Sequence, residues 1–330
     1  MQVTVSGYEH ARGNHCGTTS ISRLLRFHGH RISEAMCLGL GEGLEFVYLT
    51  GPSLNPTRYI GGRGPYLETT CFRNLGVPCT VHQTADPAEA WRWVKNEIDA
   101  GRPAMVQADI RWLDYYNTKT RFGGHKILVV GYDEEKQTAT ISDNEFDQLQ
   151  PVPLDSLARA RAETAPPFEL QNDWFEIRVP ERLADPAVAV PLAIVAQAEK
   201  MLADRGELFG VAALERAARE LPAWREAADW QWSARFAYQV IEKRGTGGGS
   251  FRKMYADFLA EGAVYCPAIE WHGLPERMRR IAAAWTALGV ELRALSEQEP
   301  PADFRPAAAL LAGLARAERE YYSAARACRG

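Results

Sequence analysis

The feature that most constrains the fold is a change in sequence pattern near residue 183. Before it, helical and strand patterns alternate along the chain; after Pro191, strand patterns disappear and Ala, Leu, Arg and Glu dominate. Alternating patterns indicate a mixed domain, and an uninterrupted series of helical patterns indicates a helical one. With 330 residues the chain is long enough for both. We therefore predict an α+β protein with a mixed domain at 1–183 and an all-α domain at 184–330.

Local periodicity predicts the individual elements. In the first domain, apolar residues at helical spacing predict helices over 16–28, 32–40 and 87–100. β-rich or alternating runs predict strands over 2–6, 44–50, 104–110, 126–133, 138–143 and 172–180. The segment 159–171 contains a proline pair and is expected to be a surface loop. In the second domain, helices are predicted over 191–204, 208–220, 224–242, 250–261, 274–296 and 306–328.

Charge and hydropathy exclude several classes of protein. The net charge is −4 and no long basic run occurs, which argues against binding of nucleic acid through its phosphates. Residues 1–16 lack the charged and apolar regions of a secretion signal. No apolar run approaches the ~20 residues that a membrane-spanning helix needs. We therefore expect a cytoplasmic protein without a membrane partner.

The six cysteines show no pattern of a metal site or a disulfide framework. They stand at 16, 37, 71, 79, 266 and 328, and no Cys-x-x-Cys pair occurs. Only Cys71 and Cys79 come near each other in sequence, whereas structural zinc sites need clustered ligands. We expect no bound metal, and we expect most cysteines to fill the core.

Cys16 has a position that suggests chemistry. The stretch GNHCGTTS (13–20) precedes the apolar run ISRLLRFHG and places this cysteine where a helix should begin. Unpaired N–H groups and the helix dipole favour a thiolate at such a position. The position alone also fits an inert buried cysteine, so a reactive role depends on further residues.

Two later segments supply suitable partners. In GGHKILVVGYD (123–133), His125 opens an apolar strand, and in ISDNEFD (141–147), Asp143 ends the following strand. In an antiparallel hairpin the start of one strand lies beside the end of the next, which brings Asp143 to the His125 ring. Singly, the two fit a surface histidine and a turn residue. Together with Cys16 they follow the order Cys, His, Asp of papain-like cysteine peptidases, so we predict a nucleophile, its base and an orienting carboxylate.

Longer stretches carry a family resemblance. They are GNHCGTTSISRLLRFHGHRISEAMCLGLGEGLEFVYL (13–49), GRPAMVQADIRWLDYY (101–116) and GGHKILVVGYD (123–133). Together they resemble the N-terminal family of butirosin biosynthesis protein H, which is related to the peptidases that remove double-glycine leaders. The segment IEKRGTGGGSFRKMYADFLAEG (241–262) resembles the domain of unknown function that commonly follows this family.

The resemblance implies a papain-like fold and a role in antibiotic biosynthesis. The implied reaction is acyl transfer from an acyl carrier protein to a small-molecule amine of the aminoglycoside type. The donor is a thioester on the carrier's phosphopantetheine arm, and no other cofactor is implied. Cys16 would be the nucleophile, His125 the base and Asp143 its orienter.

The chain departs from the papain-like pattern at one position. Those peptidases place a glutamine six residues before the cysteine as an oxyanion donor, and here that position holds His10. The Cys16 N–H can donate one hydrogen bond, and His10, Asn14 and His15 are candidates for the second. The change disfavours peptide hydrolysis more than thioester chemistry, because a thioester has the better leaving group.

Further residues are weaker candidates for substrate binding. Asp109, with Tyr115 and Tyr116 after it, can hold a cationic amine, although a solvated carboxylate with two half-buried tyrosines fits slightly better. Glu34 belongs either to the site or to the first turn of its own helix.

The segment KRGTGGGSFRK (243–253) lacks the ending of a nucleotide-binding P-loop. Its candidate residues, which can cradle the phosphate of phosphopantetheine, are Arg244, Thr246, Gly247 and Gly248, flanked by Lys243, Arg252 and Lys253. The alternative is a tight corner between two helices.

Two alternative functions stay open. The same three residues would serve a cysteine hydrolase, namely a peptidase, an amidase or a thioesterase, with water as the acceptor. A binding protein with a vestigial site is the third interpretation. Assembly into a homo-oligomer stays open as well.

Overall fold

The structure, a computed structural model, describes residues 1–164, 169–300 and 302–328. The chain forms two compact units: unit 1 comprises Met1–Glu34 and Gly76–Leu183, and unit 2 comprises Ala35–Leu75 and Ala184–Gly330. The predicted boundary at 183 coincides with one junction between the units. The expected division differs over 35–75, which group with the C-terminal residues. The predicted α+β class is confirmed, with an antiparallel sheet in unit 1 and helices dominating unit 2.

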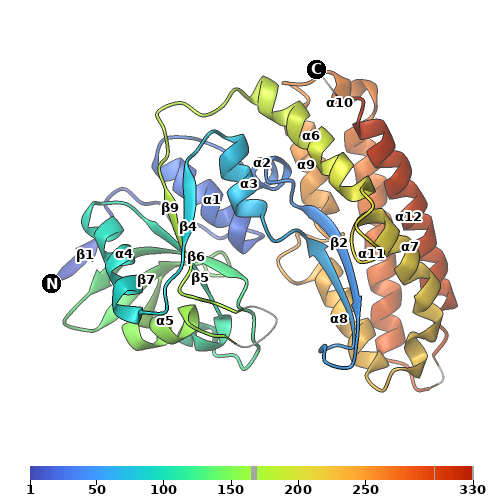
Figure 1. The fold of residues 1–330 in the computed structure, drawn as a ribbon, viewed down its shortest axis with the longest axis horizontal. Coiled ribbons are helices and arrows are strands. Elements are labelled where there is room, and N and C mark those ends of the chain that lie inside the picture. Colours follow the sequence, from blue (N-terminus) through green and yellow to red (C-terminus); the bar gives the residue numbers. More distant parts are fainter. Residues whose placement is uncertain (165–168, 301, 329–330) are drawn as a thin grey trace. The chain divides into compact units, whose positions relative to one another are not determined.

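Unit 1 is built on an antiparallel sheet (Figure 1). In the described part of the chain it has seven strands in the order β4-β9-β5-β6-β7-β8, with β1 paired to β6. The strands are β1 (Gln2–Thr4), β4 (Cys79–His82), β5 (Ala104–Ala108), β6 (His125–Asp133), β7 (Thr138–Ser142), β8 (Gln150–Pro153) and β9 (Trp174–Ile177). The central strand β6 is buried along its whole length.

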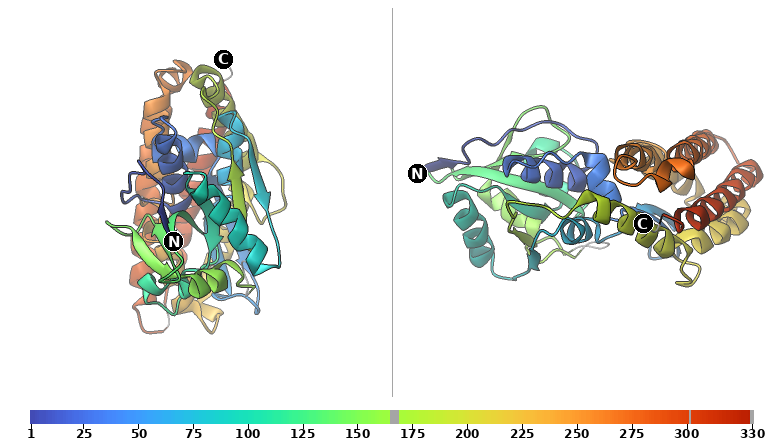
Figure 2. Two further views of the ribbon diagram at one scale, coloured as in Figure 1. Left: turned by 90° about the vertical axis from the view of Figure 1, so that its left-hand side faces the viewer. Right: turned by 90° about the horizontal axis from the view of Figure 1, so that it is seen from above.

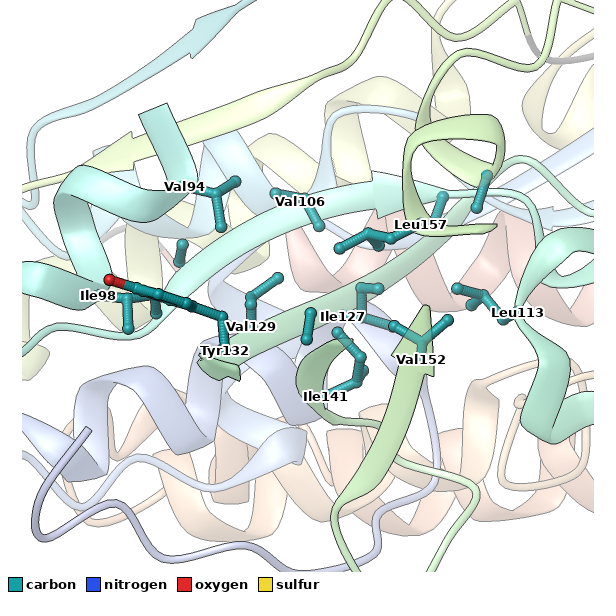
Figure 3. Packing of buried hydrophobic residues seen from close by; sticks show 14 of the residues in the cluster. Val94, Ile98, Val106, Leu113, Ile127, Val129, Tyr132, Ile141, Val152 and Leu157 are labelled. Carbon is teal, nitrogen blue, oxygen red and sulfur yellow. The ribbon is translucent and has the colours of Figure 1, made fainter. Parts of the chain in front are cut away.

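Helices cover both faces of this sheet. Helix α1 (Cys16–Phe27) lies on one face, and α4 (Pro87–Asp99) lies on the other (Figure 2). Alternating β6 side chains serve the two faces. Ile127 and Val129 join the core that α4 and α5 (Leu154–Arg161) complete, as Figure 3 shows. The side chains between them along β6 point to the opposite face, where α1 packs.

Unit 2 contains a two-stranded hairpin and a series of helices. Its elements are α2 (Glu34–Leu40), β2 (Leu44–Thr50), β3 (Arg58–Arg63), α3 (Leu67–Asn74), α6 (Pro186–Leu202), α7 (Gly210–Glu220), the 3-10 helix η3 (Leu221–Glu226), α8 (Trp230–Glu242), α9 (Arg252–Gly262), α10 (Ala268–Trp271), α11 (Leu274–Ser296) and α12 (Arg305–Ala325). The β2–β3 hairpin packs against α7 and α8 and buries Phe46 and Tyr48, which explains why 35–75 belong to this unit. Beyond Ala184, the described residues contain no strand, as predicted.

Several element boundaries differ from the predictions. Strand β5 ends at Ala108, because the next residue caps the 3-10 helix η1 (Ile110–Trp112). Helix α6 begins before Pro191, because Asp185 caps it and Pro186 occupies its first turn. The expected loop at 159–171 begins inside α5, and its proline pair at 166–167 lies outside the described residues. Within the described ranges, no helix combines the length and apolar character needed to cross a bilayer.

Candidate active site

Hydrogen bonds within unit 1 bring two segments distant in sequence to the start of α1. The Gly13 N–H donates to the Asn144 carbonyl at 3.0 Å, which ties the loop before Cys16 to the loop after Asp143. One turn into the helix, the Ser20 hydroxyl donates to the Lys126 carbonyl at 3.3 Å. Since Lys126 follows His125, these two bonds fix the helix start relative to the start of β6 and the end of β7.

His125 contacts both of its expected partners. Its Nε2 lies 2.7 Å from Oδ2 of Asp143, and both residues are buried. Its ring also interacts electrostatically with the Cys16 thiol, so that each favours the charged form of the other. Because Asp143 occupies Nε2, the ring nitrogen that remains for the thiol is Nδ1. The structure therefore places the histidine between the sulfur and the carboxylate.

Asp143 accepts several further hydrogen bonds. The hydroxyl of Tyr115 donates to Oδ2 at 2.9 Å, and that of Tyr116 donates to Oδ1 at 3.2 Å. The Glu145 N–H also donates to Oδ1. These donors stabilise an ionised carboxylate inside the protein, where an unpaired charge would be costly.

The electrostatics favour the charged forms of Cys16, His125 and Asp143. Burial lowers the pKa of His125, but Asp143 and Cys16 outweigh it and raise that pKa to about 10. Burial raises the pKa of the Cys16 thiol, but His15 and His125 outweigh it and bring that pKa well below its ordinary value. The pKa of Asp143 is lowered, because His125 and the other donors more than offset burial. These shifts favour the charged forms, namely a thiolate, an imidazolium and a carboxylate.

Glu34 binds the loop that precedes Cys16. Its carboxylate accepts hydrogen bonds from the backbone N–H groups of Asn14 at 3.0 Å and His15 at 3.2 Å. It also accepts from the hydroxyls of Thr18 at 2.9 Å and Thr19 at 2.8 Å. Sequence reasoning gave these threonines no role, although the pair directly after Cys16-Gly17 was visible as a polar start to an otherwise apolar helix.

The three oxyanion candidates differ in their surroundings. His10 has both ring nitrogens engaged, Nδ1 at 2.8 Å from the Ser142 hydroxyl and Nε2 at 3.0 Å from the Phe146 carbonyl. Asn14 is exposed. His15 is buried, caps α1, and has its Nε2 at 4.0 Å from the Cys16 sulfur.

The structure gives the candidate amine-binding residues different partners. Asp109 is buried, and its Oδ1 accepts from the N–H groups of Arg111 at 2.9 Å and Phe122 at 3.2 Å. The Tyr115 and Tyr116 hydroxyls donate to Asp143 instead. Both tyrosines come from the 3-10 helix η2 (Asp114–Tyr116), so this helix lies beside Asp143.

The glycine-rich segment of unit 2 forms a corner that satisfies its own polar groups. The Thr246 hydroxyl donates to the Ile241 carbonyl at 2.9 Å and accepts from the Gly248 N–H at 3.0 Å. Arg244 donates to the Gln239 side chain. Gly247 and Gly248 both have positive φ, as a tight turn requires.

Metal ligands are not grouped anywhere in the described ranges. No cluster there contains three or more His, Cys, Asp or Glu residues placed to hold a metal ion.

Two family models match the chain in sequence. The first, described as "Butirosin biosynthesis protein H, N-terminal", matches residues 15–144, a range that contains Cys16, His125 and Asp143. The second, described as "Domain of unknown function (DUF4872)", matches residues 155–325, which is more than half of the chain. A search of curated proteins found no match.

Proposed function

Because the chain belongs to the family in which a butirosin biosynthesis protein H N-terminal region precedes a DUF4872 domain, we propose that it is an acyltransferase of antibiotic biosynthesis. In this proposal, unit 1 is a papain-like catalytic domain. The donor is an acyl thioester on the phosphopantetheine arm of an acyl carrier protein, and the acceptor is a small-molecule amine. The observation that carries the proposal is the position of His125, which contacts both Cys16 and Asp143.

The first half-reaction acylates the enzyme. The Cys16 thiolate attacks the thioester carbonyl, a C–S bond forms, and the carbonyl electron pair moves onto oxygen. Collapse of this tetrahedral intermediate breaks the bond to the phosphopantetheine sulfur. The departing thiolate takes the proton of the His125 imidazolium, which leaves an acyl-Cys16 thioester and a neutral histidine.

The second half-reaction transfers the acyl group. The acceptor amine attacks the acyl-Cys16 carbonyl, and neutral His125 removes the amine proton. Collapse expels the Cys16 thiolate and restores the imidazolium. The sum is thioester plus amine to amide plus thiol, with no oxidation or reduction. Asp143 orients the ring and stabilises its charge in both steps.

One observation supports thioester chemistry over peptide hydrolysis. His10 stands where papain-like peptidases carry their glutamine, and its two ring nitrogens are engaged with Ser142 and Phe146. A thioester expels a good leaving group, so it depends less on the missing donor than an amide does.

Intact-mass analysis tests this function. The wild-type protein and its Cys16→Ala variant are incubated with a panel of acyl-carrier thioesters, with and without amines. We expect an acyl adduct on the wild type only, discharged by an amine to give an amide. Cys79→Ala, at a half-buried thiol, is the matched control and should still form the adduct. Discharge to water alone would identify a hydrolase, and the lack of an adduct with every donor would overturn acyl transfer.

A further inference from the structure

We propose that the side chain of His15 completes the oxyanion hole. Its Nε2–H and the Cys16 backbone N–H together would hold the negative oxygen of the tetrahedral intermediate. The inference rests on Cys16 acting as an acyl-accepting nucleophile. Oxyanion stabilisation needs preorganised donors next to the reacting carbon, and the residue at the usual glutamine position does not supply one here.

The backbone at the start of α1 leaves one donor in the right place. The N–H groups of Asn14 and His15 bind Glu34, and the Thr18 N–H binds the His15 ring. In the described part of the chain, the Cys16 N–H has no such partner, although Cys16 is only 6% exposed. A buried N–H without a partner costs about 1–3 kcal/mol, so a substrate oxygen that accepts from it is stabilised.

The hydrogen bond that caps α1 determines which nitrogen of His15 carries the proton. The Thr18 N–H donates to Nδ1 at 3.3 Å, so Nδ1 must be unprotonated. The proton of the ring therefore lies on Nε2, the atom 4.0 Å from the Cys16 sulfur. His15 thus acts on the Cys16 sulfur, and on an oxygen bound beside it, as an N–H donor through Nε2.

The donor is held rigidly, as preorganised stabilisation requires. Glu34 binds the backbone of His15 and the hydroxyl of Thr18, so both ends of the capping bond are fixed by one carboxylate. A Cβ on Gly13 would lie 2.1 Å from Oγ1 of Thr19, so the loop before His15 packs directly against α1.

The alternatives fit less well. In His10, Nε2 must donate to the Phe146 carbonyl, which can only accept. The Ser142 hydroxyl accepts from Tyr8, so it donates to the remaining nitrogen of His10, Nδ1. No N–H of that ring is left for a substrate. Asn14 is exposed, whereas an oxyanion donor works in a site from which water is excluded.

Comparison of two reactions at the same sulfur separates this role from support of the thiolate. Acylation by p-nitrophenyl acetate passes through an oxyanion, whereas alkylation by iodoacetamide displaces iodide and forms none. His15→Asn keeps a good helix cap for the Thr18 N–H but removes the distal N–H. His28→Asn, at the other end of α1, is the matched control. Both rates are measured above the thiol pKa of each variant, so that all proteins react as thiolates.

We expect His15→Asn to lower acylation by about 10²- to 10³-fold, the usual effect of removing one oxyanion donor, with alkylation nearly unchanged. His28→Asn should change neither rate. An equal loss in both reactions, or no loss in acylation, would overturn the proposal. His15→Ser, which also caps a helix, replaces His15→Asn if the latter does not unfold cooperatively. If p-nitrophenyl acetate acylates the wild type but no carrier thioester does, the proposed acyl donor is wrong. The role of His15 is then still decided by the ratio of the acylation rate to the alkylation rate.

Discussion

The two units each bury a cluster of ionisable groups, and the clusters differ in how completely they are paired. In unit 2, Arg252 and Glu318 are both 0% exposed and lie 2.9 Å apart. Glu318 also accepts from Trp285 Nε1 at 2.6 Å, and Arg252 donates to the Ser250 carbonyl at 2.9 Å. Both charges are thus neutralised and hydrogen-bonded, as a structural ion pair must be.

In unit 1 the side chains are paired, but one backbone donor beside the sulfur is not. Asp143 is surrounded by donors and binds His125, but beyond His125 lies the Cys16 N–H, which has no partner among the described residues. Incomplete pairing at one end gives a substrate somewhere to bind. Burial of charge alone therefore does not mark a reactive site; an unsatisfied end beside a nucleophile does.

The largest expected effect is the loss of turnover when Cys16, in the incompletely paired cluster of unit 1, is replaced. Cys16→Ala should abolish both the acyl adduct and product formation, because it removes the only nucleophile in the mechanism. It should leave cooperative unfolding intact, since only a sulfur at a helix start is lost. Turnover by mass spectrometry and thermal unfolding check this. If Cys16→Ala kept wild-type turnover, the assignment of Cys16, His125 and Asp143 as a catalytic triad would be wrong.

The next largest effect is on the free energy of unfolding, in the fully paired cluster of unit 2. Arg252→Ala should lower the free energy of unfolding by about 3–5 kcal/mol, because Glu318 would be left as a buried, uncompensated charge. Arg319→Ala is the matched control on an exposed ion pair with Glu215, expected to cost at most ~1 kcal/mol. Urea unfolding gives both values. Equal losses of unfolding free energy in the two variants would show that the buried Arg252–Glu318 pair is no more important for stability than an exposed ion pair.

A smaller effect on turnover is expected at Asp143. Asp143→Asn keeps a hydrogen-bond acceptor for His125 but removes the charge, which we expect to slow turnover by roughly 10- to 100-fold, the worth of a charge-assisted hydrogen bond. Asp143 holds the pKa of His125 up at about 10, so the alkaline limb of the pH–rate profile should move to lower pH.

The raised pKa of His125 also makes the stability of the fold depend on pH. A raised pKa of His125 stabilises the fold fully below its unfolded value of about 6.5, and the stabilisation is lost as the pH rises through about 10. Asp143→Asn should therefore lower the free energy of unfolding most at pH values below about 6.5. A pH profile identical to the wild type would show that the carboxylate does not set the charge of the ring.

The smallest effect is expected at the tyrosines. Tyr116→Phe removes one of several donors to Asp143, and we expect a loss of turnover of about 2- to 10-fold, the usual worth of one hydrogen bond. Tyr66→Phe, 75% exposed, is the control and should have no effect. Steady-state kinetics with a single amine separate the causes: a rise in KM for the amine alone would assign Tyr116 to acceptor binding instead.

Local patterns were enough to predict the helix that carries Cys16 and the hairpin that carries His125 and Asp143. The apolar stripe of α1 and the alternation of β6 and β7 depend on residues close in sequence. The hairpin brings the start of β6 near the end of β7, and in the structure the His125 ring lies 2.7 Å from Asp143.

Partners chosen by tertiary packing could not be predicted. Nothing near Arg252 in sequence points to Glu318, which lies 66 residues away on another helix. Likewise, the direction of the Tyr115 and Tyr116 hydroxyls depends on how η2 packs, so their link to Asp143 rather than to Asp109 was not visible. The grouping of residues 35–75 with unit 2 follows from helices more than 130 residues further on.

Competitive alkylation tests the central claim most directly, namely that Cys16 is a reactive thiolate supported by His125. The folded protein is treated with limiting iodoacetamide at neutral pH, and the labelled peptides are quantified by mass spectrometry. The account predicts that Cys16 is labelled ahead of the other five cysteines, and that His125→Ala removes this preference. Labelling of the half-buried Cys79 ahead of Cys16, or a Cys16 rate that His125→Ala leaves unchanged, would contradict it.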